Sequence, residues 1–385
     1  MAKVTPVENR LSIGSTLLNL VCSDDPTCGM VRGKYHWMAG HSSSGKTFLS
    51  LTAFAEAAKN PHWDDVDLVF DDVEGGAMMD FPRFFGQKMA DRVMPPSGNW
   101  DEPGFSTHLE HVYSYLTERI ENKKKWKGKP FLYLLDSHDA VTTLYAEKKW
   151  KELKREADGG KAAKGDFGDG KAAINSRQMR LLISDLERTG NTVMFLSQTR
   201  DNVNAGMFES PDKISGGHAL KFYALWQMMS KRGATITRTI NGTKREIGMI
   251  SRVKVSKNRL TGKEWTVDMP IYHSYGIDDI GACVDLLLRE KHWDIGADAK
   301  KKAGKESPAR KRAVTKSGDD GDEKKMKITD TSFVNAPDFK FSGTRRELIR
   351  KIEADRLQLD LIDITTDVWH DLVAKLDVGR PCRFE

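Results

Sequence analysis

Between Gly40 and Thr47 the chain reads GHSSSGKT, which satisfies the pattern G-x-x-x-x-G-K-[ST]. The segment follows an apolar run at Tyr35–Gly40 and opens a stretch with helical periodicity at residues 47–58. Glycines let such a loop curl so that successive backbone N–H groups and the start of the helix face one point, which favours an anion. We therefore predict a strand, a phosphate-binding loop and a helix, in that order.

The motif assigns a role to each kind of residue. Lys46 is expected to neutralise the β- and γ-phosphates of ATP, and the Thr47 hydroxyl to bind Mg²⁺. ATP and Mg²⁺ are therefore the predicted cofactors. The residues predicted to contact the nucleotide are Gly40, His41, Ser42, Ser43, Ser44, Gly45, Lys46, Thr47 and Phe48.

Carboxylates at the ends of two further apolar runs complete this prediction. The run at residues 131–135 ends in Asp136, which we expect to anchor Mg²⁺ together with Thr47. The run at residues 66–70 is followed by Asp71, Asp72 and Glu74, and one of these acids is expected to take the proton of the water that attacks the γ-phosphate. Spacing alone does not choose among the three.

Short apolar runs alternate with segments of helical periodicity through the first half of the chain. This alternation is typical of an α/β fold with a mostly parallel sheet covered by helices. Farther on, two β-rich segments at 246–257 and 264–273 flank a turn region, so we expect the core to end in antiparallel strands. A helix at 278–290 is expected to close the core.

The composition changes after this core. Residues 295–327 hold eleven Lys/Arg, six Asp/Glu and no aromatic residue, which predicts a flexible linker. Its basic part is either solvated chain or a segment that scans DNA. Beyond it, Thr344 and Glu347 form a possible capping box for the first of two helices. We thus predict an amino-terminal arm (1–11), an ATPase core (12–294), the linker (295–327) and a small helical carboxy-terminal module (328–385).

Composition argues against a membrane or secreted protein and leaves open whether the chain binds nucleic acid. No run approaches the ~18 apolar residues of a membrane span, and the first ten residues lack an apolar signal core, so we expect a cytoplasmic protein with no membrane partner. The formal net charge of +6 favours a polyanionic partner, although many proteins with this charge bind no nucleic acid.

The order of motifs resembles the bacterial RecA recombinases and their phage counterparts. After the phosphate loop, the acidic strand end and the Asp136 strand come FLSQTR at 195–200, SGGHALKFY at 215–223 and RVKVSKNR at 252–259. The similarity runs from about residue 12 to 290. The G-G-x-A-L-K-F-Y string is its most specific part, because other ATPases with a phosphate loop lack it. The resemblance implies a RecA-like core.

The resemblance also assigns functional residues. Glu74 matches the catalytic glutamate of the family, Asp136 its magnesium aspartate, and Gln198 the glutamine that senses the γ-phosphate. Lys257 and Arg259 match two lysines that reach the γ-phosphate of a neighbouring subunit, with arginine at the second position here. Phe222 matches an aromatic residue at the same boundary. The DNA contacts that it implies are Arg180, Arg200, Met207, Phe208, Lys213, Gly216, Gly217 and His218; four of them lie in a loop at 199–215 and three at its end.

The function that the resemblance implies is ATP-dependent recombination. The protein is expected to form helical filaments on single-stranded DNA and to promote homologous pairing and strand exchange with double-stranded DNA, aided by a single-strand binding or mediator protein. Two alternatives are a hexameric, ring-shaped DNA helicase of the same fold and a regulatory ATP switch. Only eleven residues precede Ser12, which leaves the subunit interlock open, and the compact length favours a viral origin.

Overall fold

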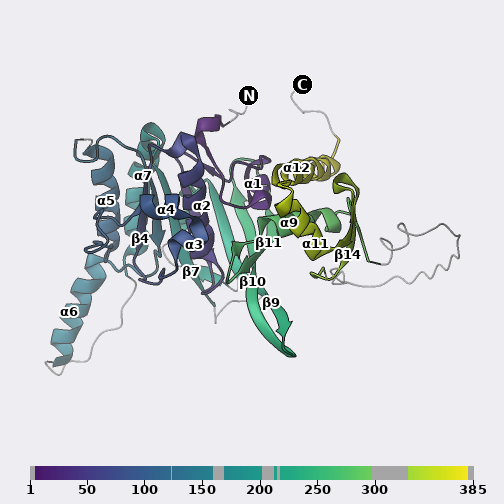
Figure 1. Cartoon of the computed structure of the whole chain (residues 1–385). Coiled ribbons are helices and arrows are strands. Elements are labelled where there is room, and N and C mark those ends of the chain that lie inside the picture. The colour runs from purple at the N-terminus through teal and green to yellow at the C-terminus, as the bar shows by residue number, and fades with distance from the viewer. Residues whose placement is uncertain are drawn as a thin grey trace, which may run out of the picture. The chain divides into compact units, whose positions relative to one another are not determined.

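The computed structural model describes residues 5–122, 124–158, 169–201, 212–214, 217–296 and 328–379. It divides into two compact units, Met1–Asp278 and Asp279–Glu385 (Figure 1). The contacts thus place the helix predicted at 278–290 with the second unit. Residues 297–327, most of the predicted linker, lie outside the described residues.

A single large sheet organises the first unit, in the order β12-β11-β10-β9-β3-β7-β6-β4-β5, with β8 paired to β7. The segment from β3 to β5 is parallel, and β9 to β12 are antiparallel. The prediction of a mostly parallel sheet with antiparallel strands at its end is confirmed. The strands are β3 (Tyr35–Gly40), β4 (Asp67–Asp72), β5 (Val93–Met94), β6 (Phe131–Asp136), β7 (Thr192–Asp201), β8 (Asp212–Ile214), β9 (Trp226–Ile240), β10 (Thr243–Asn258), β11 (Trp265–Tyr272) and β12 (Gly276–Ile277).

Helices flank this sheet because its central strands are apolar on both faces. Every residue of β3 and β6 is buried, so each face needs a cover. Apolar residues of α5 and α7, among them Leu116 and Leu182, pack with Tyr133 and Phe195 of the strands. The helices are α1 (Thr16–Ser23), α2 (Lys46–Lys59), α3 (Phe81–Phe85), α4 (Gln87–Arg92), α5 (Leu109–Glu121), α6 (Leu144–Asp158), α7 (Lys171–Thr189) and α8 (His218–Tyr223). A small two-stranded sheet pairs β1 (Arg10–Leu11) with β2 (Met30–Val31).

Strands β9 and β10 form a long hairpin that extends past the other strands (Figure 1). Its turn is Asn241–Gly242, and both residues have positive φ, 51° and 74°, as a tight hairpin turn requires. From position 231 to 246 the hairpin carries five Lys/Arg and one Glu, and most of these positions are exposed. The β-rich segment predicted at 246–257 is therefore most of a longer strand, and the sequence pattern indicated its partner β11 but not its partner β9.

The second unit contains the two predicted helices, α11 (Arg345–Ala354) and α12 (Gln358–Lys375). The capping box of Thr344 and Glu347 is present at the start of α11. A three-stranded antiparallel sheet that was not predicted packs beside them, formed by β13 (Asp294–Ile295), β14 (Phe333–Ala336) and β15 (Phe341–Thr344). Helix α9 (Asp279–Arg289) completes this unit. Arg345 is buried and pairs with Asp285 and Asp330, so the charge that the fold buries here is compensated.

Among the described residues, the helices are all too short or too polar to cross a lipid bilayer.

Candidate nucleotide-binding site

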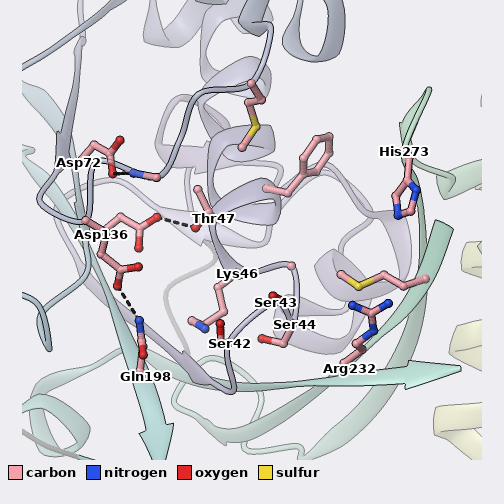
Figure 2. Close-up of a pocket in the computed structure, with 16 residues that line it drawn as sticks. Ser42, Ser43, Ser44, Lys46, Thr47, Asp72, Asp136, Gln198, Arg232 and His273 are labelled. Atoms are coloured by element: carbon pink, nitrogen blue, oxygen red, sulfur yellow. Dashed lines mark hydrogen bonds between the residues drawn. The ribbon is translucent and has the colours of Figure 1, made fainter. Parts of the chain in front are cut away.

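The predicted phosphate loop connects the end of β3 to the start of α2 and lines a cavity of about 470 Å³ (Figure 2). Seven of the nine residues predicted to contact the nucleotide line it; Gly40 and His41 do not. The lining residues are Ser42, Ser43, Ser44, Gly45, Lys46, Thr47, Phe48, Asp72, Glu74, Gly76, Met79, Asp136, Gln198, Arg232, Met249 and His273.

Neighbouring strands hold the loop in shape. The carbonyl oxygen of Ser44 accepts hydrogen bonds from the Ser230 hydroxyl (2.9 Å) on β9 and the Ser251 hydroxyl (2.7 Å) on β10. A Cβ at Gly40 would lie 2.1 Å from the Ser230 carbonyl oxygen, so β9 leaves room only for glycine there. Gly45 has φ +90°, a conformation that residues with a side chain rarely adopt. The antiparallel strands therefore shape the loop from one side.

Lys46 is folded back onto its own loop. Its Nζ donates to the carbonyl oxygens of Gly40 (2.9 Å) and His41 (2.8 Å). Burial lowers the pKa of Lys46, and the nearby carboxylates of Asp136 and Glu74 act in the opposite direction. The cation thus lies at the floor of the cavity beside acidic groups, where phosphate oxygens would give it stronger partners than two carbonyls.

The side chains of Thr47 and Asp136, the two predicted magnesium ligands, contact each other. The Thr47 hydroxyl donates to Asp136 Oδ2 at 2.5 Å, and Asp136 is only 5% exposed. Burial raises the pKa of Asp136 to about 6, against the Thr47 hydrogen bond, which lowers it. A hydroxyl and a carboxylate at this distance suit Mg²⁺, which takes few protein oxygens and completes its shell with water and phosphate. The residues present therefore fit the ion that the motif implies.

The structure separates the three candidate acids. Asp71 is fully buried and accepts hydrogen bonds from the Tyr133 hydroxyl (2.5 Å) and the Ser106 backbone N–H (3.0 Å). Its pKa is raised, chiefly by burial. Asp72 reaches the cavity but accepts from the backbone N–H groups of Gly76 (3.3 Å) and Ala77 (3.1 Å). Both carboxylates thus have structural partners.

Glu74, the third acid, lines the cavity together with Lys46 and Gln198. Its Oε1 accepts a hydrogen bond from Gln198 Nε2 (2.8 Å) and another from the Ser137 hydroxyl. Gln198 is fixed in turn, because its backbone N–H donates to Asp139 Oδ2 at 2.7 Å. Strands β6 and β7 thus bring Asp136 and Gln198 to the same end of the cavity (Figure 2), and Gln198 holds Glu74 beside them.

The predicted subunit-boundary residues form a separate cluster that does not line the cavity. Lys257 Nζ donates to the carbonyl oxygens of Lys221 (2.5 Å) and Phe222 (2.7 Å), in the last turn of α8. Arg259 Nη2 donates to the Phe222 carbonyl at 2.6 Å, and its guanidinium lies 5.6 Å from the Phe222 ring. The ring is 61% exposed. Partial burial, with Arg259 and Lys221 nearby, lowers the pKa of Lys257 to about 8.

Three of the eight residues predicted to contact DNA are fully described. Arg180 is exposed on α7, while Gly217 and His218 start α8, which packs beside α7. A Cβ at Gly217 would lie 2.8 Å from that of Ala172 on α7. The backbones of Arg200 and Lys213 pair between β7 and β8, but their side chains lie outside the description. So do Met207, Phe208 and Gly216.

The sequence prediction missed one wall of the cavity. Arg232 of β9, Met249 of β10 and His273, just after β11, line it opposite Asp136 (Figure 2). The signal that could have found them is the two-residue period of a strand: Arg232 stands two places from Ser230, and Met249 two places from Ser251. Both serines bind the phosphate loop.

Comparison with known proteins agrees with this geometry. Residues 154–278 match the model of the RecA N-terminal domain. The chain is 26% identical to Protein RecA of Lactococcus lactis subsp. cremoris (strain MG1363) over 266 residues, which is 68% of this chain and 60% of that protein. It is 25% identical to Protein RecA of Francisella tularensis subsp. novicida (strain U112) over 275 residues, 69% of this chain and 66% of that protein. The chain is thus similar to RecA proteins over about two thirds of its length.

The domain match and the cavity geometry cover different regions of the RecA-like core. The match to the domain model contains Gln198, Phe222, Lys257 and Arg259, but it begins after the phosphate loop and after Asp136. For those earlier residues, the geometry of the cavity is the direct support. The chain spans less than two thirds of the length of these relatives.

Proposed function

We propose that this protein is a RecA-family, DNA-dependent ATPase that forms filaments on single-stranded DNA and promotes homologous pairing and strand exchange in recombination and repair. The observation that carries the proposal is the contact of Glu74 with Gln198, beside the Thr47–Asp136 pair in the cavity of the phosphate loop. It brings a general base, a metal-binding pair and a phosphate-binding lysine to one site, which is what hydrolysis of a nucleoside triphosphate requires.

In this proposal ATP lies with its phosphates on the loop. Lys46 exchanges the carbonyl oxygens of Gly40 and His41 for phosphate oxygens. Thr47 and Asp136 hold Mg²⁺, which neutralises charge on the β- and γ-phosphates when it is bound. Glu74 accepts the proton of the attacking water, and the Ser137 hydroxyl and Gln198 amide orient its carboxylate.

Gln198 connects the chemistry to the DNA-binding segment. It lies on β7, three residues before the end of that strand at Asp201, and the strand then leads into the loop predicted to bind DNA. A side chain that binds Glu74 in the free state and the γ-phosphate in the ATP state changes partners on hydrolysis. We infer that this exchange lowers the affinity of the loop for DNA once the γ-phosphate has left.

ATP also joins neighbouring subunits in this proposal. Lys257 and Arg259 are held by carbonyl oxygens of α8 and do not line the cavity of their own chain. Because a γ-phosphate is a far stronger partner for these cations than a neutral carbonyl, we infer that they turn to the ATP of an adjacent subunit. Exposed Phe222 would pack at the same boundary.

The proposed nucleic-acid partners are single-stranded and double-stranded DNA, bound through phosphates and therefore weakened steeply by salt. A single-strand binding or mediator protein is the proposed protein partner. Arg180, Gly217 and His218 supply the described portion of the DNA surface, on α7 and at the start of α8.

Electron microscopy of the purified protein with single-stranded DNA and a non-hydrolysable ATP analogue tests the proposal. Extended helical filaments are expected, and the matched Lys46→Ala variant should form none. Closed rings under the same conditions would refute the filament model and support the ring-shaped helicase. DNA that leaves the rate of ATP hydrolysis unchanged would refute the DNA-dependent ATPase.

A further inference from the structure

The cavity of the phosphate loop has two chemically different ends. Asp72, Asp136 and Gln198 lie on one side of Lys46 and Thr47, whereas Arg232 and His273 lie on the other (Figure 2). The second side also contains Met249, on the strand next to Arg232. One end is thus acidic and suited to a metal and an attacked phosphate, and the other combines a guanidinium, an imidazole and a thioether.

Strand geometry directs Arg232 into this cavity. Side chains alternate along a strand, and Ser230 faces the phosphate loop, where its hydroxyl binds the Ser44 carbonyl. Arg232 stands two residues farther along β9 and therefore points to the same side. Among the described residues that line the cavity, Lys46 and Arg232 are the two with a permanent positive charge.

The contacts of Arg232 do not account for its position. Its Nη2 binds Glu246 Oε1 at 2.8 Å, and the two side chains are 42% and 40% exposed. An exposed ion pair of this kind contributes little to stability, about 0–1 kcal/mol. It also occupies one of the five N–H groups of a guanidinium, and the remaining ones suit phosphate oxygens, ribose hydroxyls and the polar edge of a base.

The position of Glu74 fixes the direction of the nucleotide. The phosphate that is attacked must lie beside Glu74 and Gln198, so the rest of the nucleotide extends from the loop toward the opposite end. We propose that Arg232 is a further nucleotide-binding residue, which binds the portion that ATP and ADP share from the hairpin of the same chain. The inference rests on the proposed function, in that it takes ATP as the ligand of the cavity.

This placement separates binding from chemistry. A cation that contacts the shared portion of the nucleotide stabilises the ATP complex, the ADP complex and the transition state alike, so its loss raises KM and leaves kcat unchanged. A cation at the γ-phosphate would instead distinguish ATP from ADP. The two locations therefore predict different results for the same variant.

The test is the dissociation constant of ATP and of ADP, measured by calorimetry on the full chain. Arg232→Ala should weaken both by about tenfold or more, the effect of losing a charge-assisted hydrogen bond. Hydrolysis at saturating ATP should stay within about twofold of the wild type. Arg232→Lys, which keeps the charge but not the planar guanidinium, should lose less affinity for ATP and ADP than Arg232→Ala. Arg238→Ala, on the exposed outer portion of the same hairpin, is the matched control and should change neither constant.

Unchanged affinity for both nucleotides in Arg232→Ala would overturn the inference, and so would a loss for ATP alone. Thermal melting of each variant checks that it is folded, and Arg232→Lys offers a second reading if the alanine variant is not. The two proposals fail differently. If the wild-type chain binds neither nucleotide, the proposed ATPase is wrong; if it binds both and Arg232→Ala binds them equally well, only the role of Arg232 is wrong.

Discussion

The acidic cluster around Glu74 and the basic cluster around Lys257 both lie in the first unit, but they are bonded in different ways. Glu74, Gln198 and Ser137 come from separate segments and hydrogen-bond to one another. Lys257 and Arg259 instead bind carbonyl oxygens at the end of α8, where the negative end of a helix attracts any cation. One chain therefore assembles the acidic cluster of the proposed catalytic site from its own residues, while Lys257 and Arg259 bind neutral carbonyl oxygens that the proposal replaces with a phosphate.

The largest expected effect is on the acidic cluster. Glu74→Gln keeps the size and the hydrogen bond of the side chain but removes the base, so ATP hydrolysis should fall by about 100- to 10,000-fold. Binding of ATP and DNA should persist, because Lys46, Thr47 and Asp136 are unchanged. Steady-state hydrolysis and filter binding measure the two properties. A Glu74→Gln protein that hydrolyses ATP normally would show that the base lies elsewhere.

A mixing experiment separates the two clusters by subunit. Lys46→Ala and Lys257→Ala should each be nearly inactive alone. The first lacks the lysine of the subunit that binds ATP, and the second lacks the lysine that the adjacent subunit contributes. In an equimolar mixture, about a quarter of head-to-tail boundaries join an intact phosphate loop to an intact Lys257, so some of the activity should return. DNA-stimulated ATP hydrolysis measures the recovery. If the mixture stays as inactive as its components, Lys257 does not act across a boundary.

The pH dependence of ATP-dependent assembly on DNA should report the titration of Lys257 in the basic cluster. Lys257 has a pKa of about 8 in the free chain, so at pH 9 only about a tenth of it carries the proton that a phosphate contact needs. ATP-dependent assembly on DNA should therefore weaken by about tenfold between pH 7 and pH 9. Lys257→Arg should flatten this profile, because arginine stays charged. Light scattering at matched ionic strength measures assembly, and a profile that is equally steep in both proteins would exclude Lys257 as the titrating group.

The same pKa has the opposite effect on the stability of the isolated chain. A lysine whose pKa is lower in the folded state leaves the unfolded chain with more bound protons between about pH 8 and pH 10.5. The contribution of Lys257 to folding stability therefore rises with pH in this window, while its contribution to assembly falls. Comparing urea unfolding with assembly over this range distinguishes the two.

The smallest effect on activity is expected at Asp71, which belongs to the fold beneath the acidic cluster. Asp71→Asn disturbs the buried hydrogen bonds with Tyr133 and Ser106 and should cost about 1–3 kcal/mol of stability. Hydrolysis should remain within about threefold, because this carboxylate does not line the cavity. Urea unfolding measures the change in stability, and kcat measures the change in hydrolysis. A large loss of kcat in a stable Asp71→Asn protein would contradict the assignment of the base to Glu74.

The sequence predicted best those features that depend only on neighbouring residues. The phosphate loop needs only a strand, two glycines, Lys46 and Thr47 in a row, and Asp136 needs only an apolar strand before it. Choosing among Asp71, Asp72 and Glu74 was different, because the partners that occupy Asp71 are Tyr133 and Ser106, far along the chain. From the residues alone the choice stayed open until the family resemblance was added.

The wall that contains Arg232 depends on pairing between distant strands, which the sequence pattern did not indicate. Strands β9 and β10 pair with three register shifts, one of them between Met249 and Ser251, so the period of two holds from Ser230 to Arg232 but is interrupted farther along the hairpin. In the second unit, β14 and β15 are only four residues each, too short for a clear alternation, and a helical turn at Pro337–Phe339 separates them. Both helices beside them were predicted, and the first of the two carries a capping box.

Gly40 changes how variants of the phosphate loop should be interpreted. A substitution at the first glycine of this loop would not measure nucleotide binding alone, because a methyl group there would collide with the Ser230 backbone of β9. A Gly40→Ala chain would therefore have to push β3 and β9 apart before it met any ligand, and its loss of function would report misfolding. If the folding and the nucleotide affinity of many variants were compared, substitutions at Gly40 should impair folding, as substitutions at buried residues of the sheet do. Substitutions at Lys46 should impair nucleotide binding in a folded protein.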